Sequence, residues 1–180
     1  VAAVFASVIA SVVVFPRIEG AFFLRAQDDS TSTLRLVSGA IDQAIGRYDP
    51  IPELVAGDPK LRELLREAEN EGLIPFVNEK LRHMAISVSA SEIYVMDAKG
   101  LTLAASNYRE ETSFVGKNFA YRPYFQKSIA GEASQFHALG TTSGERGFFF
   151  AAPILDGIAV TGVLVVKVTA DTLETDWAGS

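Results

Sequence analysis

Residues 92–105 read EIYVMDAKGLTLAA, and this stretch decides the fold. Its first part, 92–96, and its last part, 101–105, are rich in the apolar, aromatic and β-branched residues that favour strands. The turn-forming sequence DAKG stands between them. The pattern predicts a β-hairpin.

The chain beyond the hairpin continues in short segments. Patterns of apolar residues and flanking glycines predict a short helix and then three more strands, at 123–130, 134–139, 147–153 and 158–168. The pair Asp156-Gly157 supplies a tight turn between the last two strands. This order of elements indicates an α+β domain, with an antiparallel sheet of about five strands and a long N-terminal stalk helix across one face.

Upstream of the hairpin the sequence favours helix. Between 18 and 48, apolar residues recur at spacings of three and four, which predicts a stalk helix whose apolar stripe packs on the domain or on a second subunit. The two prolines of the segment 49–52 should end that helix. An Asp-Pro pair opens a second helix at 58–72, and a third is expected at about 75–87.

The first fifteen residues, VAAVFASVIASVVVF, carry no charge. A membrane-spanning helix needs about 20 apolar residues and a signal-peptide core about 7–15. We interpret the run as the outer half of a transmembrane helix, with a signal-peptide core or a buried core helix as alternatives. The expected organisation is then the outer part of a transmembrane helix (1–17), a stalk helix and connection (18–57), a membrane-distal α+β domain (58–170) and the truncated start of a connecting helix (171–180).

Composition excludes several classes of function. The 16 basic and 22 acidic residues give a net charge of −6, which disfavours nucleic acid because that affinity comes mainly from basic residues on phosphates. The chain has no cysteine and only two histidines, His83 and His137, which excludes disulfide scaffolds, thiol catalysis and zinc sites of Cys and His. No nucleophile is seen with a matching base, so we expect no catalysis, no metal and no cofactor in this segment.

Arg122 is the sharpest candidate for ligand binding. It stands directly before Pro123 in FAYRPYF, a context typical of a helix start, where backbone N–H groups and the helix dipole favour a carboxylate. A guanidinium can hold a carboxylate through two hydrogen bonds, and Tyr121 and Tyr124 add hydroxyl donors. The alternative is a surface arginine whose aromatic neighbours pack in the core.

Lys167 interrupts the apolar run VLVVKVTA, on the same strand face as Val163 and Val165. Burying an unpaired ammonium group is costly. Lys167 therefore either faces an anionic ligand or lies on an edge strand with its amine in solvent.

Hydroxyl groups gather in the loop 140–147, GTTSGERG, which either presents them to a carboxylate or only connects two strands. Thr141, Thr142 and Ser143 stand between its first two glycines. Ser106, which follows the strand sequence LTLAA, is either a further donor or a turn former.

Several stretches together resemble a known family. They are DAKGLTLAASNYRE (97–110), TSFVGKNFAYRPYFQ (112–126), ALGTTSGERGFFFAAPI (138–154), GVLVVKV (162–168) and LETDWA (173–178). In order and spacing they are similar to the periplasmic sensor region of C4-dicarboxylate sensor histidine kinases, the DctB-like proteins, which have tandem PAS-like Cache domains. The resemblance covers roughly 93–177 and implies a PAS-like Cache fold for the domain.

The resemblance also implies a function and a site. The domain is expected to bind succinate, malate or fumarate in the periplasm, anchored in the bacterial inner membrane and paired as a homodimer through the stalk helix. The candidate ligand-binding residues are Arg122, Tyr124, Thr142 and Lys167, followed by Tyr121, Ser106, Thr141 and Ser143. The sequence does not settle which of the hydroxyl groups point toward the ligand.

The family also has a second Cache domain, a second transmembrane helix and a kinase core, and these are not in this sequence. The parent protein is therefore expected to be a histidine kinase whose catalytic core lies outside this chain. Two alternatives stay open. One is a Cache sensor for another small organic acid or an amino acid, on a chemoreceptor or a cyclase, and the other is a ligand-free dimerisation module.

Overall fold

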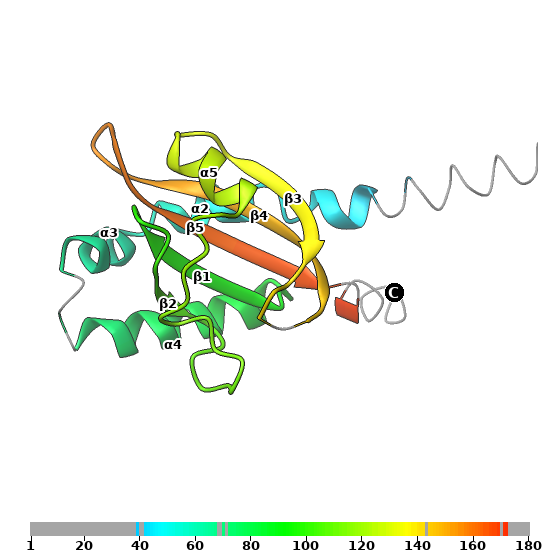
Figure 1. Cartoon of the computed structure of the whole chain (residues 1–180), viewed down its shortest axis with the longest axis horizontal. Helices are drawn as coiled ribbons and strands as arrows, with labels where there is room; N and C mark the ends of the chain where they lie inside the picture. The colour runs from blue at the N-terminus through cyan, green and yellow to red at the C-terminus, as the bar shows by residue number, and fades with distance from the viewer. Residues whose placement is uncertain are drawn as a thin grey trace, which may run out of the picture. The chain divides into compact units, whose positions relative to one another are not determined.

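A five-stranded antiparallel sheet organises the domain (Figure 1). Its strands are β1 (Glu92–Asp97), β2 (Thr102–Ala105), β3 (Ser134–Leu139), β4 (Arg146–Asp156) and β5 (Ala159–Thr169). They lie in the order β2-β1-β5-β4-β3. The predicted α+β class and the predicted number of strands are both confirmed.

The computed structural model describes residues 39, 42–67, 70, 72–142, 144–169 and 171–172. The expected transmembrane segment, most of the expected stalk helix and the expected helix at 173–177 lie outside these residues. Among the helices that are described, none has the length and apolar character needed to cross a membrane. A compact unit begins at Ala44 and contains the whole sheet.

Both predicted hairpin turns are present. In the β1–β2 turn, Asp97 Oδ1 accepts hydrogen bonds from the backbone N–H groups of Lys99 and Leu101, at 2.8 and 2.9 Å. Gly100 completes this turn with a φ of +80°, and Gly157 turns the chain between β4 and β5 with a φ of +65°. These are left-handed conformations that glycine adopts without steric cost.

Three helices cover one face of the sheet (Figure 1). They are α2 (Ile51–Ala56), α3 (Pro59–Arg66) and α4 (Leu73–Ser87). In α4, Leu73, Val77, Leu81 and Ala85 recur every four residues and are all buried, so they form one stripe facing the sheet. This face therefore provides a largely aliphatic core.

The helices differ from the prediction in two places. The described part of the expected stalk helix ends at 46, before the segment 49–52, as predicted. A helix that was not predicted, α2, begins in that segment, with Pro50 as its N-cap and Pro52 in its first turn. A proline at a helix start loses nothing, because the first N–H groups of a helix have no partner in the helix. Conversely, α3 begins at the predicted Asp-Pro pair but ends at Arg66, short of the expected Gly72.

The other face is covered by α5 (Pro123–Ile129) and by residues of the preceding loop. Its buried core is rich in aromatic side chains, namely Tyr94, Phe114, Phe119, Tyr124, Phe125 and Phe149. Both cationic residues singled out in the sequence, Arg122 and Lys167, contact aromatic rings of this core. The candidate site therefore lies on the α5 face.

Candidate ligand-binding site

A row of four residues crosses the sheet and includes Lys167. Glu92 on β1 pairs with Lys167 on β5, Lys167 pairs with Phe149 on β4, and Phe149 pairs with Phe136 on β3. Side chains of directly opposite residues point to the same face of a sheet. Because β5 is the middle strand and the Lys167 side chain is fully buried, the edge-strand interpretation of this lysine is wrong.

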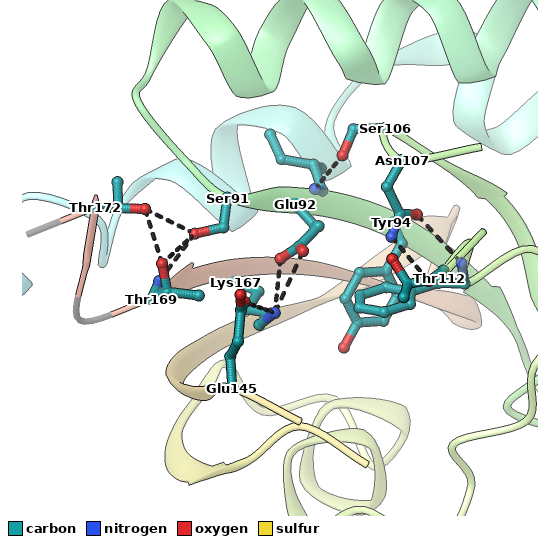
Figure 2. Close-up of polar contacts among 12 residues, drawn as sticks. Ser91, Glu92, Tyr94, Ser106, Asn107, Thr112, Glu145, Lys167, Thr169 and Thr172 are labelled. Atoms are coloured by element: carbon teal, nitrogen blue, oxygen red, sulfur yellow. Dashed lines mark hydrogen bonds and ion pairs between the residues drawn. The ribbon is translucent and has the colours of Figure 1, made fainter. Parts of the chain in front are cut away.

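The buried Lys167 ammonium group lies between two carboxylates (Figure 2). Its Nζ is 3.0 Å from Glu92 Oε2, and it donates to Glu92 Oε1 at 3.3 Å. Glu145, from the loop between β3 and β4, brings its Oε2 to 3.6 Å from the same nitrogen. A fully buried cation requires such compensation. Glu92 supplies it from strand β1, and Glu145 supplies it from the loop between β3 and β4.

Glu92 is the deeper of these two acids and has an altered pKa. Burial raises the pKa of the Glu92 carboxyl, the Lys167 ammonium group partly offsets this, and the charge of Glu145 raises the pKa further. A raised carboxyl pKa means that the ionised form is disfavoured in its surroundings. The positive charge of Lys167 favours the ionised form of the Glu92 carboxyl. Any anion that approaches Lys167 also approaches Glu92.

Arg122 occupies the N-cap position of α5 with extended backbone angles (φ −75°, ψ 135°), as its place before a proline predicts. The side chain is buried, with 9% of its surface exposed. Its Nη2 donates to the carbonyl oxygen of Leu139 and to the hydroxyl of Thr141, both at 3.1 Å. The hydroxyl of Tyr121 also lies 2.9 Å from that of Thr141. The α5 segment and the glycine-rich loop therefore meet at Thr141.

One donor of Arg122 is left over. The Nε atom is buried and has no hydrogen-bond partner among the described residues. Burying an unsatisfied donor costs about 1–3 kcal/mol, and more when the group is charged. Arg122 thus carries an N–H group that a ligand oxygen would satisfy.

Phe149 links the two cationic residues. The Arg122 Cζ lies 6.0 Å from the centre of the Phe149 ring, and Lys167 is the cross-strand neighbour of Phe149. Tyr124 stacks on Phe149 with ring centres 5.2 Å apart and an interplanar angle of 6°. Arg122 and Lys167 therefore border one aromatic surface, although they come from different elements.

Two buried phenols complete this surface. The hydroxyl groups of Tyr94 and Tyr124 are 2.8 Å apart. Burial raises the pKa of Tyr124 to about 12 and raises that of Tyr94 well above its usual range. The pKa of Tyr94 is also raised by the charge of Glu92 and lowered by that of Arg122, so its hydroxyl is within electrostatic reach of both charged groups. At neutral pH both phenols keep their protons and act as neutral hydrogen-bonding groups.

The other candidates from the sequence are placed less directly. Thr142 is half-buried beside Thr141, and Ser143 lies outside the described residues. The Ser106 Oγ accepts a hydrogen bond from the backbone N–H of Ile93 at 2.9 Å. In Figure 2 it lies across the β1 ribbon from Glu145. Ser106 is therefore tied to the end of the β1–β2 pair and is not grouped with the two cations.

Sequence reasoning missed Glu92, Glu145 and Tyr94. Glu92 and Tyr94 alternate along β1 and so share a face, but only the strand register puts Glu92 opposite Lys167. Glu145 lies in the loop 140–147, in which only the hydroxyl groups were considered as candidates. Its negative charge could have indicated a partner for a buried lysine. Among the described residues, no cluster of three or more histidine or acidic side chains is placed to hold a metal ion.

Comparison with curated proteins gives two relatives with the same description, "C4-dicarboxylate transport sensor protein DctB". The chain is 35% identical to the protein of Pseudomonas aeruginosa over 153 residues, which is 85% of this chain and 25% of the relative. It is 32% identical to that of Rhizobium meliloti over 145 residues, or 81% of this chain and 23% of the relative. The chain spans about a quarter of the length of the curated relatives it matches.

Comparison with solved structures agrees with the sequence comparison. The crystal structure of the sensor domain of the Vibrio cholerae histidine kinase DctB is 37% identical in sequence and superposes with a TM-score of 0.82. The match covers 86% of this chain and 60% of that structure. No protein-family model matches the chain.

Proposed function

Because the chain is a DctB-like sensor domain, we propose that it binds a C4-dicarboxylate such as succinate, malate or fumarate. The proposed site lies between α5, the loop joining β3 to β4, and strand β5. The domain would be the periplasmic part of a histidine kinase anchored in the inner membrane. In this segment the role is binding and not catalysis.

The observation that carries this proposal is the pair of cations on one aromatic surface. Arg122 and Lys167 come from separate elements and both border Phe149. Within residues 39, 42–67, 70, 72–142, 144–169 and 171–172, no group accepts a hydrogen bond from the buried Nε of Arg122. One ligand carboxylate would accept a hydrogen bond from Arg122 and the other would pair with Lys167, and the separation of the two cations would select the length of the diacid. The hydroxyl groups of Tyr124, Tyr121, Thr141, Thr142 and Ser143 are proposed as further donors.

Isothermal titration calorimetry of the 180-residue chain with succinate, malate, fumarate, citrate, acetate and lactate tests the ligand class. We expect binding to be confined to the four-carbon diacids. Arg122→Ala should weaken that binding at least 30-fold, since truncating a buried charged contact costs about 2–5 kcal/mol. The matched control is Arg109→Ala, because Arg109 has a mostly exposed side chain and pairs with Glu79 on α4.

The outcomes separate the open alternatives. Binding of monoacids alone would keep a sensor of organic acids and discard the dicarboxylate. Equal loss of binding in the Arg109 and Arg122 variants would remove Arg122 from the site. No binding of any acid would favour a ligand-free dimerisation module, whose melting temperature should depend on protein concentration.

A second candidate ligand is an amino dicarboxylate such as aspartate. The observation that favours it is the pair of carboxylates of Glu92 and Glu145 beside Lys167. Either carboxylate could receive a ligand ammonium group. Titration with L-aspartate and succinate in parallel distinguishes the two candidates by their relative affinities.

In the full-length protein, we propose that ligand binding shifts the arrangement of the stalk helices in a homodimer. The ligand must then bind more tightly to one arrangement than to the other, since equal affinity for both would shift nothing. A full-length kinase reconstituted in membrane vesicles should change its autophosphorylation rate with succinate. It should not respond when Arg122 is replaced by Ala.

A further inference from the structure

A carboxylate of the protein itself already lies beside the proposed ligand-binding ammonium group. The Glu145 Oε2 is 3.6 Å from Lys167 Nζ, next to the closer contact that Glu92 makes at 3.0 Å. Lysine offers three donors. Both described ion pairs of Lys167 are with carboxylates. Each end of a dicarboxylate ligand is the same chemical group.

The two glutamates differ in how firmly they are held. The Glu92 side chain is 12% exposed and projects from a paired strand, whereas that of Glu145 is 57% exposed and projects from a loop. The Lys167–Glu145 contact, at 3.6 Å, is longer than a hydrogen bond, whereas Lys167 donates a hydrogen bond to Glu92 at 3.3 Å. Of the two carboxylates, Glu145 is the one that an incoming anion can displace.

The loop that carries Glu145 also contacts the second cation. Thr141, near its start, accepts a hydrogen bond from Arg122 at 3.1 Å. The loop is closed on itself by two backbone hydrogen bonds, from the N–H of Gly140 to the carbonyl of Glu145 and from the N–H of Gly144 to the carbonyl of Gly140, at 2.7 and 2.9 Å. Gly144 has a φ of +73°, and apart from its chain neighbours no atom of a described residue lies within 4 Å of where its Cβ would be. The loop thus contacts both cations, Arg122 through Thr141 and Lys167 through Glu145.

We propose that Glu145 is an internal competitor, which occupies Lys167 in the ligand-free protein and must be displaced by a ligand carboxylate. This rests on the proposed function, because it assigns Lys167 to the ligand. Displacement frees the loop from Lys167 at the moment of binding, and it sets the affinity below what Arg122 and Lys167 alone would give. Glu145 is thereby a residue that tunes affinity without contacting the ligand.

The test compares succinate affinity in three forms of the 180-residue chain by calorimetry. Glu145→Gln keeps the shape of the side chain and removes its charge, and we expect it to tighten binding about three- to tenfold, most at low salt. Glu132→Gln makes the same change of net charge at an exposed acid before β3 and should change the affinity less than twofold. Damage to the loop would weaken binding, so tightening is a result that a merely structural role does not produce.

A second measurement needs no ligand. Acetylation of lysine amines, followed by peptide mass spectrometry, measures how accessible the Lys167 amine is to the reagent. The exposed Lys99 serves as an internal reference. Glu145→Gln should raise the labelling rate of Lys167 at least threefold and leave that of Lys99 unchanged.

The results separate this inference from the proposed function. If the unaltered chain binds succinate but Glu145→Gln binds it equally or more weakly, Glu145 is no competitor and the dicarboxylate site stands. A chain that binds aspartate best, and loses that binding in Glu145→Gln, also overturns the competitor and makes Glu145 a ligand contact. If nothing binds, the dicarboxylate proposal fails, and an unchanged labelling rate at Lys167 would then refute the covering role of Glu145 as well.

Discussion

At the scale of single residues, the site is decided by polar groups that are buried together with partners. Lys167 is buried on the middle strand, and two carboxylates lie beside its ammonium group. Arg122 is buried beside Thr141, and one of its donors has no partner in the part of the chain that the structure describes. Tyr94 and Tyr124 pair with each other through their hydroxyl groups. The burial of the Lys167 charge and of the unsatisfied Arg122 donor costs stability that a purely apolar core would not lose.

The alkaline stability of the domain should report on Tyr124. Burial raises its pKa to about 12, against about 10 in the unfolded chain. Between these values the unfolded state loses the proton and the folded state keeps it, so this contribution to the free energy of unfolding falls as pH rises. At pH 12 the loss amounts to about 3 kcal/mol at most.

Tyr124→Phe removes this titration, so its free energy of unfolding should fall less steeply between pH 9 and 11 than that of the unaltered chain. At pH 7 the variant should be less stable by about 1–2 kcal/mol, because the Tyr94 hydroxyl loses its partner. Urea unfolding at several pH values measures both effects. Parallel pH profiles for the two proteins would contradict the assignment.

At the scale of elements, the β1–β2 hairpin positions the segment that leads into α5. Gly100 accepts a backbone hydrogen bond from Phe119 at 2.9 Å, and Thr102 exchanges hydrogen bonds with Lys117 and Gly116, at 2.8 and 2.9 Å. The turn of the hairpin therefore holds the chain just before Arg122. A feature of β structure thus determines where a residue at a helix start lies.

Gly100→Ala tests this link. A Cβ at Gly100 would lie 2.6 Å from the backbone nitrogen of Ala120. At Gly116, which has nearly the same φ, no atom of another described residue lies within 4 Å, its chain neighbours excepted. Both substitutions should cost about 1–2 kcal/mol for the left-handed conformation. Only Gly100→Ala should cost about 1–3 kcal/mol more, for the overlap.

Because Ala120 is two residues before Arg122, Gly100→Ala should also weaken succinate binding, and Gly116→Ala should leave it within about twofold. Urea unfolding and calorimetry on both variants measure the two effects. Equal losses of stability in the two variants would show that the backbone near Ala120 can move away from the added Cβ at no cost in free energy. The hairpin would then not position Arg122.

At the scale of the whole molecule, the sheet separates two cores with different roles. The face under α2, α3 and α4 is largely aliphatic, and the face under α5 carries the aromatic rings and both cations. Stability and binding should therefore respond to different substitutions. Substitutions on the face under α2, α3 and α4 should change only the free energy of unfolding. Substitutions on the face under α5 should change both the free energy of unfolding and the affinity for the ligand.

Leu81→Ala and Phe149→Leu test this division. Leu81 is fully buried on the helix face, and its truncation should cost about 2–5 kcal/mol of stability while succinate affinity stays within about twofold. Phe149→Leu removes the ring beside Arg122, so succinate binding should weaken by about 2- to 30-fold, the range of a cation–π contact. If Leu81→Ala weakens binding as much as Phe149→Leu, the two faces are not independent.

The sequence by itself determined the class of the fold, the five strands and the two hairpin turns, because these depend on local patterns of apolar residues and on glycine. It also placed Arg122 at the start of a helix, since a following proline restricts the backbone locally. The start of α2 was missed because a proline that ends one helix and a proline that begins another look alike in sequence. The grouping of α5 with the glycine-rich loop was suggested by resemblance and is seen in the contact of Arg122 with Thr141.

Only the tertiary structure decided which charges meet. Glu92 and Lys167 are 75 positions apart in the chain and become neighbours through strand register, and register follows from pairing across the whole sheet and not from either strand alone. The sequence allowed Lys167 to be an edge-strand residue. The strand order places β5 in the middle of the sheet, and Lys167 is therefore a buried cation. Burial then made its carboxylate partners necessary, because an ammonium group removed from water must be compensated where it lies.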